Sequence, residues 1–376
     1  MTQNTSQRLG SLDILRGFDL FVLVFFQPVF MTIVRNTDIF LLEAIATQFR
    51  HVQWEGFTFW DVIMPLFMFM AGASMPFAFK KYLTNGSVAS LYQRIIKRVI
   101  LLFIFGMMAQ GNLLELNPEK VYFYSNTLQA IAVGYLIAAI LLIHLSLRWQ
   151  IIVSSGLLIL YWSLLTFIRV DGYGGGNFSP DYNLAEYVDR VVLGRFRDGS
   201  SMTEGGLDFG NYRYTWILSS LNFGVTVMTG VFAGMIMKSG MAKIKIIQWL
   251  AITGVLMIIA GQLWGLHMPI IKRIWTSSMT LYSSGICFLL MALFYYLVDY
   301  RDFGKYLNWL KFYGMNSILA YMLYMVVNFS SISHSLFFGT EQYLGDFYAV
   351  LIRLSNALIV FFILWFMYRQ KKFLRV

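Results

Sequence analysis

The most constraining feature of this 376-residue chain is a series of apolar runs, each close to the length that crosses a bilayer. A helix needs about 20 apolar residues to span the hydrocarbon core. Because backbone polar groups must be satisfied inside lipid, such runs fold as helices. We therefore predict an all-α polytopic membrane protein with ten spans, at approximately 18–34, 60–79, 96–114, 127–145, 150–168, 214–237, 246–266, 276–298, 309–327 and 347–368.

The composition agrees with this class. Hydrophobic residues make up 58% of the chain and charged residues 13%, whereas soluble domains carry about 25% charged residues. The net charge of +10 comes from short basic clusters between apolar runs, which orient a membrane protein and do not indicate nucleic-acid binding. We expect one transmembrane domain over residues 1–376, in contact with the lipid bilayer and not with nucleic acid.

The distribution of basic residues predicts the orientation. Eighteen lysines and arginines fall in the terminal segments and in connections on the same side as the N-terminus, against five in the short connections opposite. Since basic residues are enriched in cytoplasmic loops, we predict that both termini lie in the cytoplasm. Ten spans, an even number, meet this condition.

The longest connection, the 169–213 loop, is then expected outside. It is rich in Gly, Asp and Tyr and includes the run 172–177, Gly-Tyr-Gly-Gly-Gly-Asn. A connection of this length is typical of a functional lid or binding loop, with a plain surface connection as the alternative. The single cysteine, Cys287, and the absence of paired-histidine or HExxH spacing give no support to a metal site.

Polar side chains inside apolar runs are candidates for function, because they need a partner or a wet cavity. For the amides, the alternative is hydrogen bonding between helices. For Asp61, the alternative is a favourable position at a helix N-terminus. These residues are Gln27, Asp61, Gln129, Asn222, Gln262 and Asn316.

Histidine provides acid–base chemistry near neutral pH, and His51 is the strongest of four candidates. It lies in a polar, aromatic segment, 50–61, that leads into the second predicted span. The alternative is an interfacial residue of the membrane boundary. His144, His267 and His334 have weaker contexts.

Four blocks of sequence resemble the heparan-α-glucosaminide N-acetyltransferase family of transmembrane acyltransferases, which has bacterial relatives of unknown function. The first block, 8–17, is similar to the family pattern R-x-x-S-x-D-x-x-R-G. The second begins at His51 and continues through Trp54, Gly56, Asp61 and Pro65. The third is 269–278, similar to P-x-x-K-x-x-W-[ST]-x-S, and the fourth is Gly-Met-Asn-Ser at 314–317.

The blocks occur in the family's order and extend from residue 8 to about 325. Three positions depart from the family pattern. Gln27 stands where the family has an asparagine in helix one, Ala130 replaces an arginine after Gln129, and Glu55 replaces an asparagine after Trp54.

The resemblance implies a reaction and its partners. The acetyl group would come from cytoplasmic acetyl-CoA, a co-substrate, and pass to an amino sugar or glycan on the opposite face, without a metal. It also suggests a homodimer, and we expect a bacterial inner membrane. The acceptor, N- or O-acylation and the acyl length stay open.

The resemblance also implies roles for individual residues. His51 would be the general base or the acyl carrier, with Gln27 and Asn316 holding the carbonyl oxygen or the histidine. Asp61 or Glu55 would orient the imidazole, although structural support of its helix is an alternative for Asp61. Residues that would bind substrate or cofactor are Trp54, Lys272, Trp275, Ser278, Asn316 and Gln129.

Alternatives remain for several of these binding roles. Lys272 could instead be an interfacial anchor. Trp54, Trp60 and Trp275 would suit stacking against a sugar face, with an aromatic belt at the membrane boundary as the alternative. The donor's phosphates would be attracted by some of the arginines Arg8, Arg16, Arg94 and Arg98. The competing function is a sugar or glycolipid transporter or flippase, because amides within spans also line translocation paths. A structural scaffold would not require the histidine block.

Overall fold

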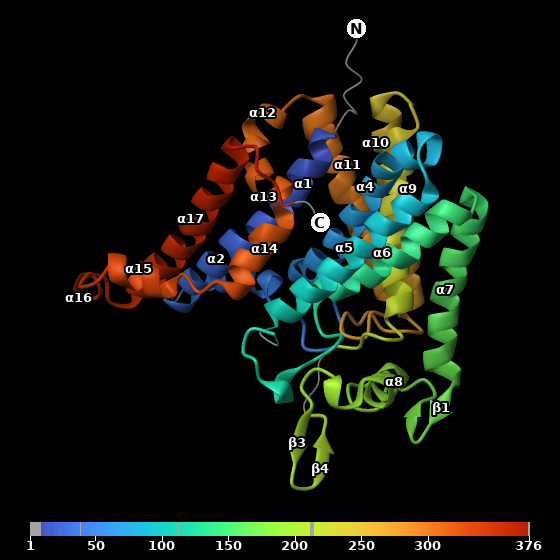
Figure 1. Ribbon diagram of the computed structural model, residues 1–376, viewed down its shortest axis with the longest axis horizontal. Helices are drawn as coiled ribbons and strands as arrows, with labels where there is room; N and C mark the ends of the chain where they lie inside the picture. Colours follow the sequence, from blue (N-terminus) through green and yellow to red (C-terminus); the bar gives the residue numbers. More distant parts are fainter. Residues whose placement is uncertain (1–8, 38, 111–112, 211–213, 375–376) are drawn as a thin grey trace. The chain divides into compact units, whose positions relative to one another are not determined.

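The computed structural model describes residues 9–37, 39–110, 113–210 and 214–374, which are mostly helical with very little β-structure (Figure 1). These residues group into two compact units. The first unit contains residues 9–43, 240–252 and 288–374, and the second contains 44–239 and 253–287. Residues of both units occur in α3 (Phe40–Ala46), α10 (Lys243–Gly265) and α11 (Ser277–Tyr295).

The first unit begins with one long apolar stretch. Helix α1 (Gly10–Phe21) passes through a π-helical turn at Val22–Phe26 into α2 (Gln27–Arg35). Helix α13 packs against α1, and α17 packs against α2 and α13. A second π-helical turn, Tyr296–Tyr300, ends α11. The other helices of this unit are α12 (Gly304–Leu307), α13 (Lys311–Met315), α14 (Ser317–Val326), α15 (Ser330–Leu336), α16 (Glu341–Leu344) and α17 (Tyr348–Arg369).

The predicted span 309–327 is not one continuous helix. Asn316, with φ −120° and ψ 41°, separates α13 from α14. Its side chain bonds the backbone of the C-terminal segment: Nδ2 donates to the carbonyl oxygen of Lys372 and Oδ1 accepts from the N–H of Leu374. An asparagine side chain that binds backbone competes with helical geometry, which explains the break.

The second unit is a helical bundle in which α4 packs against α9, and α6 packs against both α9 and α5. The approach of α4 and α9 requires glycine, because a Cβ at Gly72 would lie 1.9 Å from the carbonyl oxygen of Val227. Small residues allow such contacts between membrane helices. The helices are α4 (Ile63–Asn85), α5 (Val88–Ala109), α6 (Thr127–His144), α7 (Leu147–Phe167), α8 (Leu184–Leu193) and α9 (Ser220–Lys238).

The 169–213 loop of the sequence analysis is a folded segment in its described part. It contains the hairpin of β1 (Arg169–Val170) and β2 (Tyr173–Gly174), then helix α8, then the hairpin of β3 (Ser201–Thr203) and β4 (Gly206–Asp208) (Figure 1). Both pairs are antiparallel, with Arg169 opposite Gly174 and Ser201 opposite Asp208.

The all-α polytopic class is confirmed. Eight stretches of the described chain are long and apolar enough to cross a membrane. The predicted span at 96–114 falls largely in helix α5, whose first half carries basic residues, and it extends over residues outside the described part. The count of ten spans therefore stays a prediction. The eight stretches are Gly10–Arg35, Phe59–Lys80, Thr127–His144, Leu147–Phe167, Ser220–Lys238, Lys243–Gly265, Ser277–Tyr300 and Glu341–Arg369.

Candidate active site

Three ionisable side chains meet just before α4 in the second unit: His51, Asp61 and Lys272. Nδ1 of His51 lies 2.6 Å from Oδ1 of Asp61, and Nζ of Lys272 lies 3.3 Å from the same oxygen. The side chains of Asp61 and Lys272 are 1% and 6% exposed, whereas that of His51 is 41% exposed. A buried carboxylate therefore lies between two basic groups, and the imidazole is the accessible member.

A helix-capping arrangement fixes the carboxylate. Thr58 precedes the short 3₁₀ turn Phe59–Val62 that leads into α4. The backbone N–H of Thr58 donates to Oδ2 of Asp61 at 3.1 Å, and its hydroxyl lies 3.0 Å from Oδ2. The bond from the Thr58 N–H to the Asp61 side chain belongs to a capping box, which satisfies an N–H group at the start of the helix. Because Thr58 occupies Oδ2, Oδ1 faces His51 and Lys272.

Backbone pairing brings Lys272 to the histidine block from more than 200 positions away. The N–H of Gly56 donates to the carbonyl oxygen of Ile270 at 2.9 Å, and Glu55 forms an isolated antiparallel bridge with Ile271. Lys272 follows directly. Two motif blocks that are far apart in the sequence thus form one site.

The hydrogen bond to Asp61 selects the tautomer of His51. A carboxylate only accepts hydrogen bonds, so Nδ1 carries the proton and Nε2 keeps its lone pair. Nζ of Lys272, 3.4 Å from Nδ1, is also a donor, so its favourable partner is Asp61. Within the described residues no group hydrogen-bonds to Nε2. This nitrogen is therefore available to take a proton or to attack a carbonyl.

The surroundings keep the imidazole neutral. Partial removal from water lowers the pKa of His51 below its ordinary value of 6.5. The hydrogen bond to Asp61 acts in the opposite direction, and the positive charges of Lys272 and Arg273 add to the lowering. The base form therefore predominates at pH 7.

The segment that carries Lys272 is held rigidly. The hydroxyl of Ser278 donates to the carbonyl oxygen of Met268 at 2.6 Å, and the hydroxyl of Thr276 accepts from the N–H of Ile271 at 3.1 Å. Trp275 has a φ of 49°, which is rare for a bulky side chain. Surrounding contacts maintain this conformation, because Asn222 donates to the carbonyl oxygen of Trp275 at 2.7 Å.

The three tryptophans proposed for sugar stacking have different surroundings. Trp275 is 1% exposed, and its Nε1 donates to the hydroxyl of Thr226 at 3.0 Å, which favours a structural role. Trp54 is half-buried and donates through Nε1 to the carbonyl oxygen of Phe178 at 2.9 Å. The ring of Trp60 lies 6.2 Å from that of His51 and remains partly exposed.

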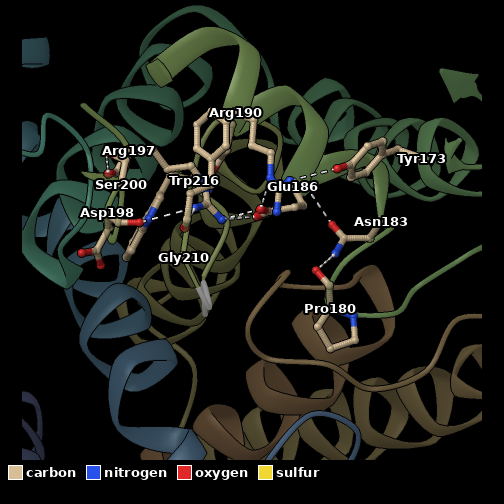
Figure 2. Close-up of polar contacts among 12 residues, drawn as sticks. Tyr173, Pro180, Asn183, Glu186, Arg190, Arg197, Asp198, Ser200, Gly210 and Trp216 are labelled. Carbon is tan, nitrogen blue, oxygen red and sulfur yellow. Dashed lines mark hydrogen bonds and ion pairs between the residues drawn. The ribbon is translucent and has the colours of Figure 1, made fainter. Parts of the chain in front are cut away.

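The 169–213 segment is anchored by buried ion pairs, which sequence reasoning missed (Figure 2). Nη2 of Arg197 lies 2.5 Å from both carboxylate oxygens of Glu186, and Nε of Arg190 lies 2.6 Å from Oε1. Arg197 and Glu186 are almost fully buried. The i, i+4 spacing of Glu186 and Arg190 was a usable helix signal. Through Phe178, this segment also touches Trp54 of the histidine block.

Three other predicted residues of the second unit, Gln129, Arg94 and Arg98, contact neighbouring residues of the protein. Gln129 is buried and completes a capping box with Asn126, accepting from the N–H groups of Ser125 and Asn126. Arg94 donates to the hydroxyl of Tyr82 at 2.8 Å. The guanidinium of Arg98 lies 4.4 Å from the centre of the Tyr135 ring.

Three of the other predicted residues, Arg16, Gln27 and Asn316, belong to the first unit. Arg16 lies 3.9 Å from Asp13 one turn earlier in α1. Gln27 begins α2, and Asn316 separates α13 from α14 while it binds the C-terminal segment. Arg8 lies outside the described residues.

Within the part of the chain that the structure describes, the other histidines have no carboxylate partner of the kind that His51 has. His144 pairs with the hydroxyl of Tyr92 at 2.6 Å, and His334 with that of Tyr348 at 2.9 Å. Among the described residues, no group of three His, Cys, Asp or Glu side chains is placed to hold a metal ion.

Comparison with known proteins adds to this geometry. The fold and the site describe a polytopic membrane protein with a carboxylate-oriented histidine. A family described as "Domain of unknown function (DUF5009)" matches residues 8–167. The chain is also similar to heparan-alpha-glucosaminide N-acetyltransferases of human and mouse, so the resemblance predicted from the four blocks is confirmed.

The two matches cover a larger share of this chain than of the relatives. The human protein is 28% identical over 367 residues, covering 84% of this chain and 52% of its own length. The mouse protein is 26% identical over 322 residues, covering 73% of this chain and 48% of its own length. The chain thus spans about half the length of the curated relatives it matches. Both relatives are named as N-acetyltransferases.

Proposed function

We propose that this protein transfers an acetyl group from acetyl-CoA to an amine or hydroxyl of an amino sugar or glycan, with His51 as general base. The observation that carries the proposal is the short contact between His51 Nδ1 and Asp61 Oδ1, which leaves Nε2 as an accessible proton acceptor. The names of the curated relatives supply the substrate class.

The reaction uses one proton cycle. Nε2 of His51 takes a proton from the acceptor amine or hydroxyl as that group attacks the thioester carbonyl. The carbon–sulfur bond then breaks, and the imidazolium returns the proton to the leaving thiolate. General base catalysis of this kind contributes about 10²–10⁴-fold. Asp61 stabilises the imidazolium that forms between the two steps.

In this scheme, Lys272 acts on the charge states of both Asp61 and His51. Its ammonium group lies 3.3 Å from the buried Asp61 carboxylate, so the carboxylate stays ionised even when His51 is neutral. Its positive charge also opposes premature protonation of the imidazole. A buried charge of either sign would be costly alone, which makes the pair mutually dependent.

An acyl-enzyme route is the second form of the same proposal. Nε2 of His51 could attack the thioester carbonyl directly and carry the acetyl group to the acceptor. Both routes require the same tautomer and the same accessible nitrogen. A single turnover without acceptor distinguishes them, because only the acyl-enzyme route releases stoichiometric coenzyme A and labels His51.

The donor's phosphates would bind at the opposite end of the helices from His51. Asp61 lies before α4, and Arg94 and Arg98 follow the other end of that 23-residue helix, which is about 35 Å long. Nε of Arg98 is buried without a hydrogen-bond partner in the described part of the chain. Such a group favours recruitment of a phosphate oxygen. Only the acyl arm then has to approach His51.

The experiment compares His51→Ala with a matched histidine control. Purified protein in detergent is given acetyl-CoA and glucosamine, and free thiol is measured. His144→Ala is the control, since His144 is exposed and pairs only with Tyr92 among the described residues. We expect His51→Ala to lose roughly 10²–10⁴-fold in rate and His144→Ala to remain active.

Two outcomes would overturn the proposal. Full activity of folded His51→Ala would remove the base. Failure of the wild-type protein to bind or consume the thioester, together with transport of a labelled sugar in vesicles, would favour the transporter.

A further inference from the structure

A separate arginine in the first unit marks a second candidate site. Arg353 lies in α17, inside the apolar stretch Glu341–Arg369. No described residue forms a hydrogen bond or an ion pair with its guanidinium. An arginine within a membrane span is costly unless it has a partner or reaches the interface, so its presence indicates a function.

Arg353 lines a cavity of about 230 Å³ in the same unit. Tyr324 lines it too, and its hydroxyl lies within electrostatic range of the guanidinium. Val24, Ala357 and Val360 form an apolar part of the wall. The cavity therefore combines a cationic mouth with an apolar interior.

The polar wall is preorganised by hydrogen bonds. Nδ2 of Asn356 donates to the hydroxyl of Ser330 at 3.0 Å, while its Oδ1 accepts from the hydroxyl of Ser333 at 2.5 Å. These contacts tie α15 to α17 and hold the mouth in place. They leave the guanidinium of Arg353 as the charged group at the cavity wall without a protein partner in the described chain.

Exposed aromatic residues place this mouth near the surface of a membrane. Phe338, Tyr343 and Phe347, just before α17, are 91%, 83% and 50% exposed. Aromatic side chains of this kind are enriched at the level of the lipid head groups. Arg353 lies six positions after Phe347, about 9 Å along the helix, so its side chain can reach that level.

We propose that this cavity binds an anionic phospholipid. The phosphate would bind the guanidinium of Arg353 through charge-assisted hydrogen bonds. The first methylenes of an acyl chain would pack against Val24 and Val360, which a free phosphate could not do. This proposal is independent of the chemistry at His51.

The test measures lipid-dependent stabilisation of the full chain in detergent. Dioleoylphosphatidylglycerol is titrated against the melting temperature of wild type, Arg353→Gln and Arg369→Gln. Arg369 is the matched control, because it lies in the last turn of the same helix with its guanidinium 5.0 Å from the Trp365 ring. We expect Arg353→Gln to need about tenfold more lipid and Arg369→Gln to match wild type.

A second variant and two soluble phosphates complete the test. Ala357→Leu fills the apolar wall while it keeps Arg353, and we expect it to weaken lipid binding as well. Inorganic phosphate and glycerol 3-phosphate are expected to give no comparable rise in melting temperature. Equal lipid response of wild type and Arg353→Gln, or equal stabilisation by inorganic phosphate and by lipid, would overturn the proposal.

Discussion

Nδ1 of His51 lies 2.6 Å from Oδ1 of Asp61, and both residues belong to the segment that leads into α4. The carboxylate is held by Thr58 through its other oxygen, so it cannot turn away from the imidazole. This arrangement orients a base with its reactive nitrogen directed away from the carboxylate.

Asp61→Asn should reduce kcat by roughly 10²–10⁴-fold. An amide can donate to Nδ1, which would move the imidazole proton to Nε2 and remove the lone pair from the reactive position. The substitution also leaves Lys272 without its carboxylate partner, so thermal unfolding should be measured alongside kcat. A folded Asp61→Asn protein with kcat within twofold of wild type would contradict the assigned tautomer.

Lys272→Met should move the acid limb of the pH–rate profile to higher pH. The positive charge of Lys272 lowers the pKa of His51, so its removal raises that pKa. Activity requires neutral His51 and therefore rises with pH through this pKa. The variant should lose relatively more activity at pH 6 than at pH 8, whereas Lys272→Arg should keep the wild-type profile. An acid limb that stays in place or moves to lower pH would show that Lys272 does not act on His51.

Trp275→Ala should destabilise the protein by about 3–5 kcal/mol, because it removes a large buried side chain. The loss should appear in thermal unfolding. A stacking role predicts the opposite pattern, with a raised KM for the sugar at unchanged stability. Trp60→Ala provides the comparison, since Trp60 is partly exposed beside His51.

Glu186→Gln should loosen the 169–213 segment. Breaking this buried ion pair removes the Glu186 carboxylate charge from Arg197, at a cost of about 3–5 kcal/mol. Faster hydrogen exchange in α8 is the expected measurement. Arg195→Gln is the control, because the Arg195 side chain contacts the carbonyl oxygen of Pro118 at an exposed position. Equal exchange in all three proteins would mean that the ion pairs do not hold the segment.

The sequence was informative wherever a local pattern carried the signal. Apolar runs predicted most of the long helices, and the motif blocks named His51, Asp61 and Lys272. Their contact could not be derived, since it depends on the pairing of Gly56 with Ile270 across the fold. A further local pattern was overlooked: Asn126 and Gln129 have the spacing of a capping box.

Other features depend on tertiary context. Trp275 looks accessible beside Lys272 in the sequence, but its ring is buried because Asn222 and Thr226 hold the backbone and the indole. Asn316 was expected within a span, yet its side chain binds the C-terminal backbone and interrupts the helix. The periodicity of apolar residues along the sequence does not predict such tertiary contacts. Arg353 was overlooked because the surrounding apolar run satisfied the criterion for a span.

The central claim, that the imidazole of His51 is the base, is tested most directly by chemical rescue of His51→Gly. The side chain of His51 is 41% exposed in the wild-type protein, so added imidazole can reach the position that the glycine variant leaves empty. Acetyl transfer by the variant should be low, and it should rise with the concentration of neutral imidazole towards the wild-type rate. Full activity of His51→Gly without imidazole would contradict the account.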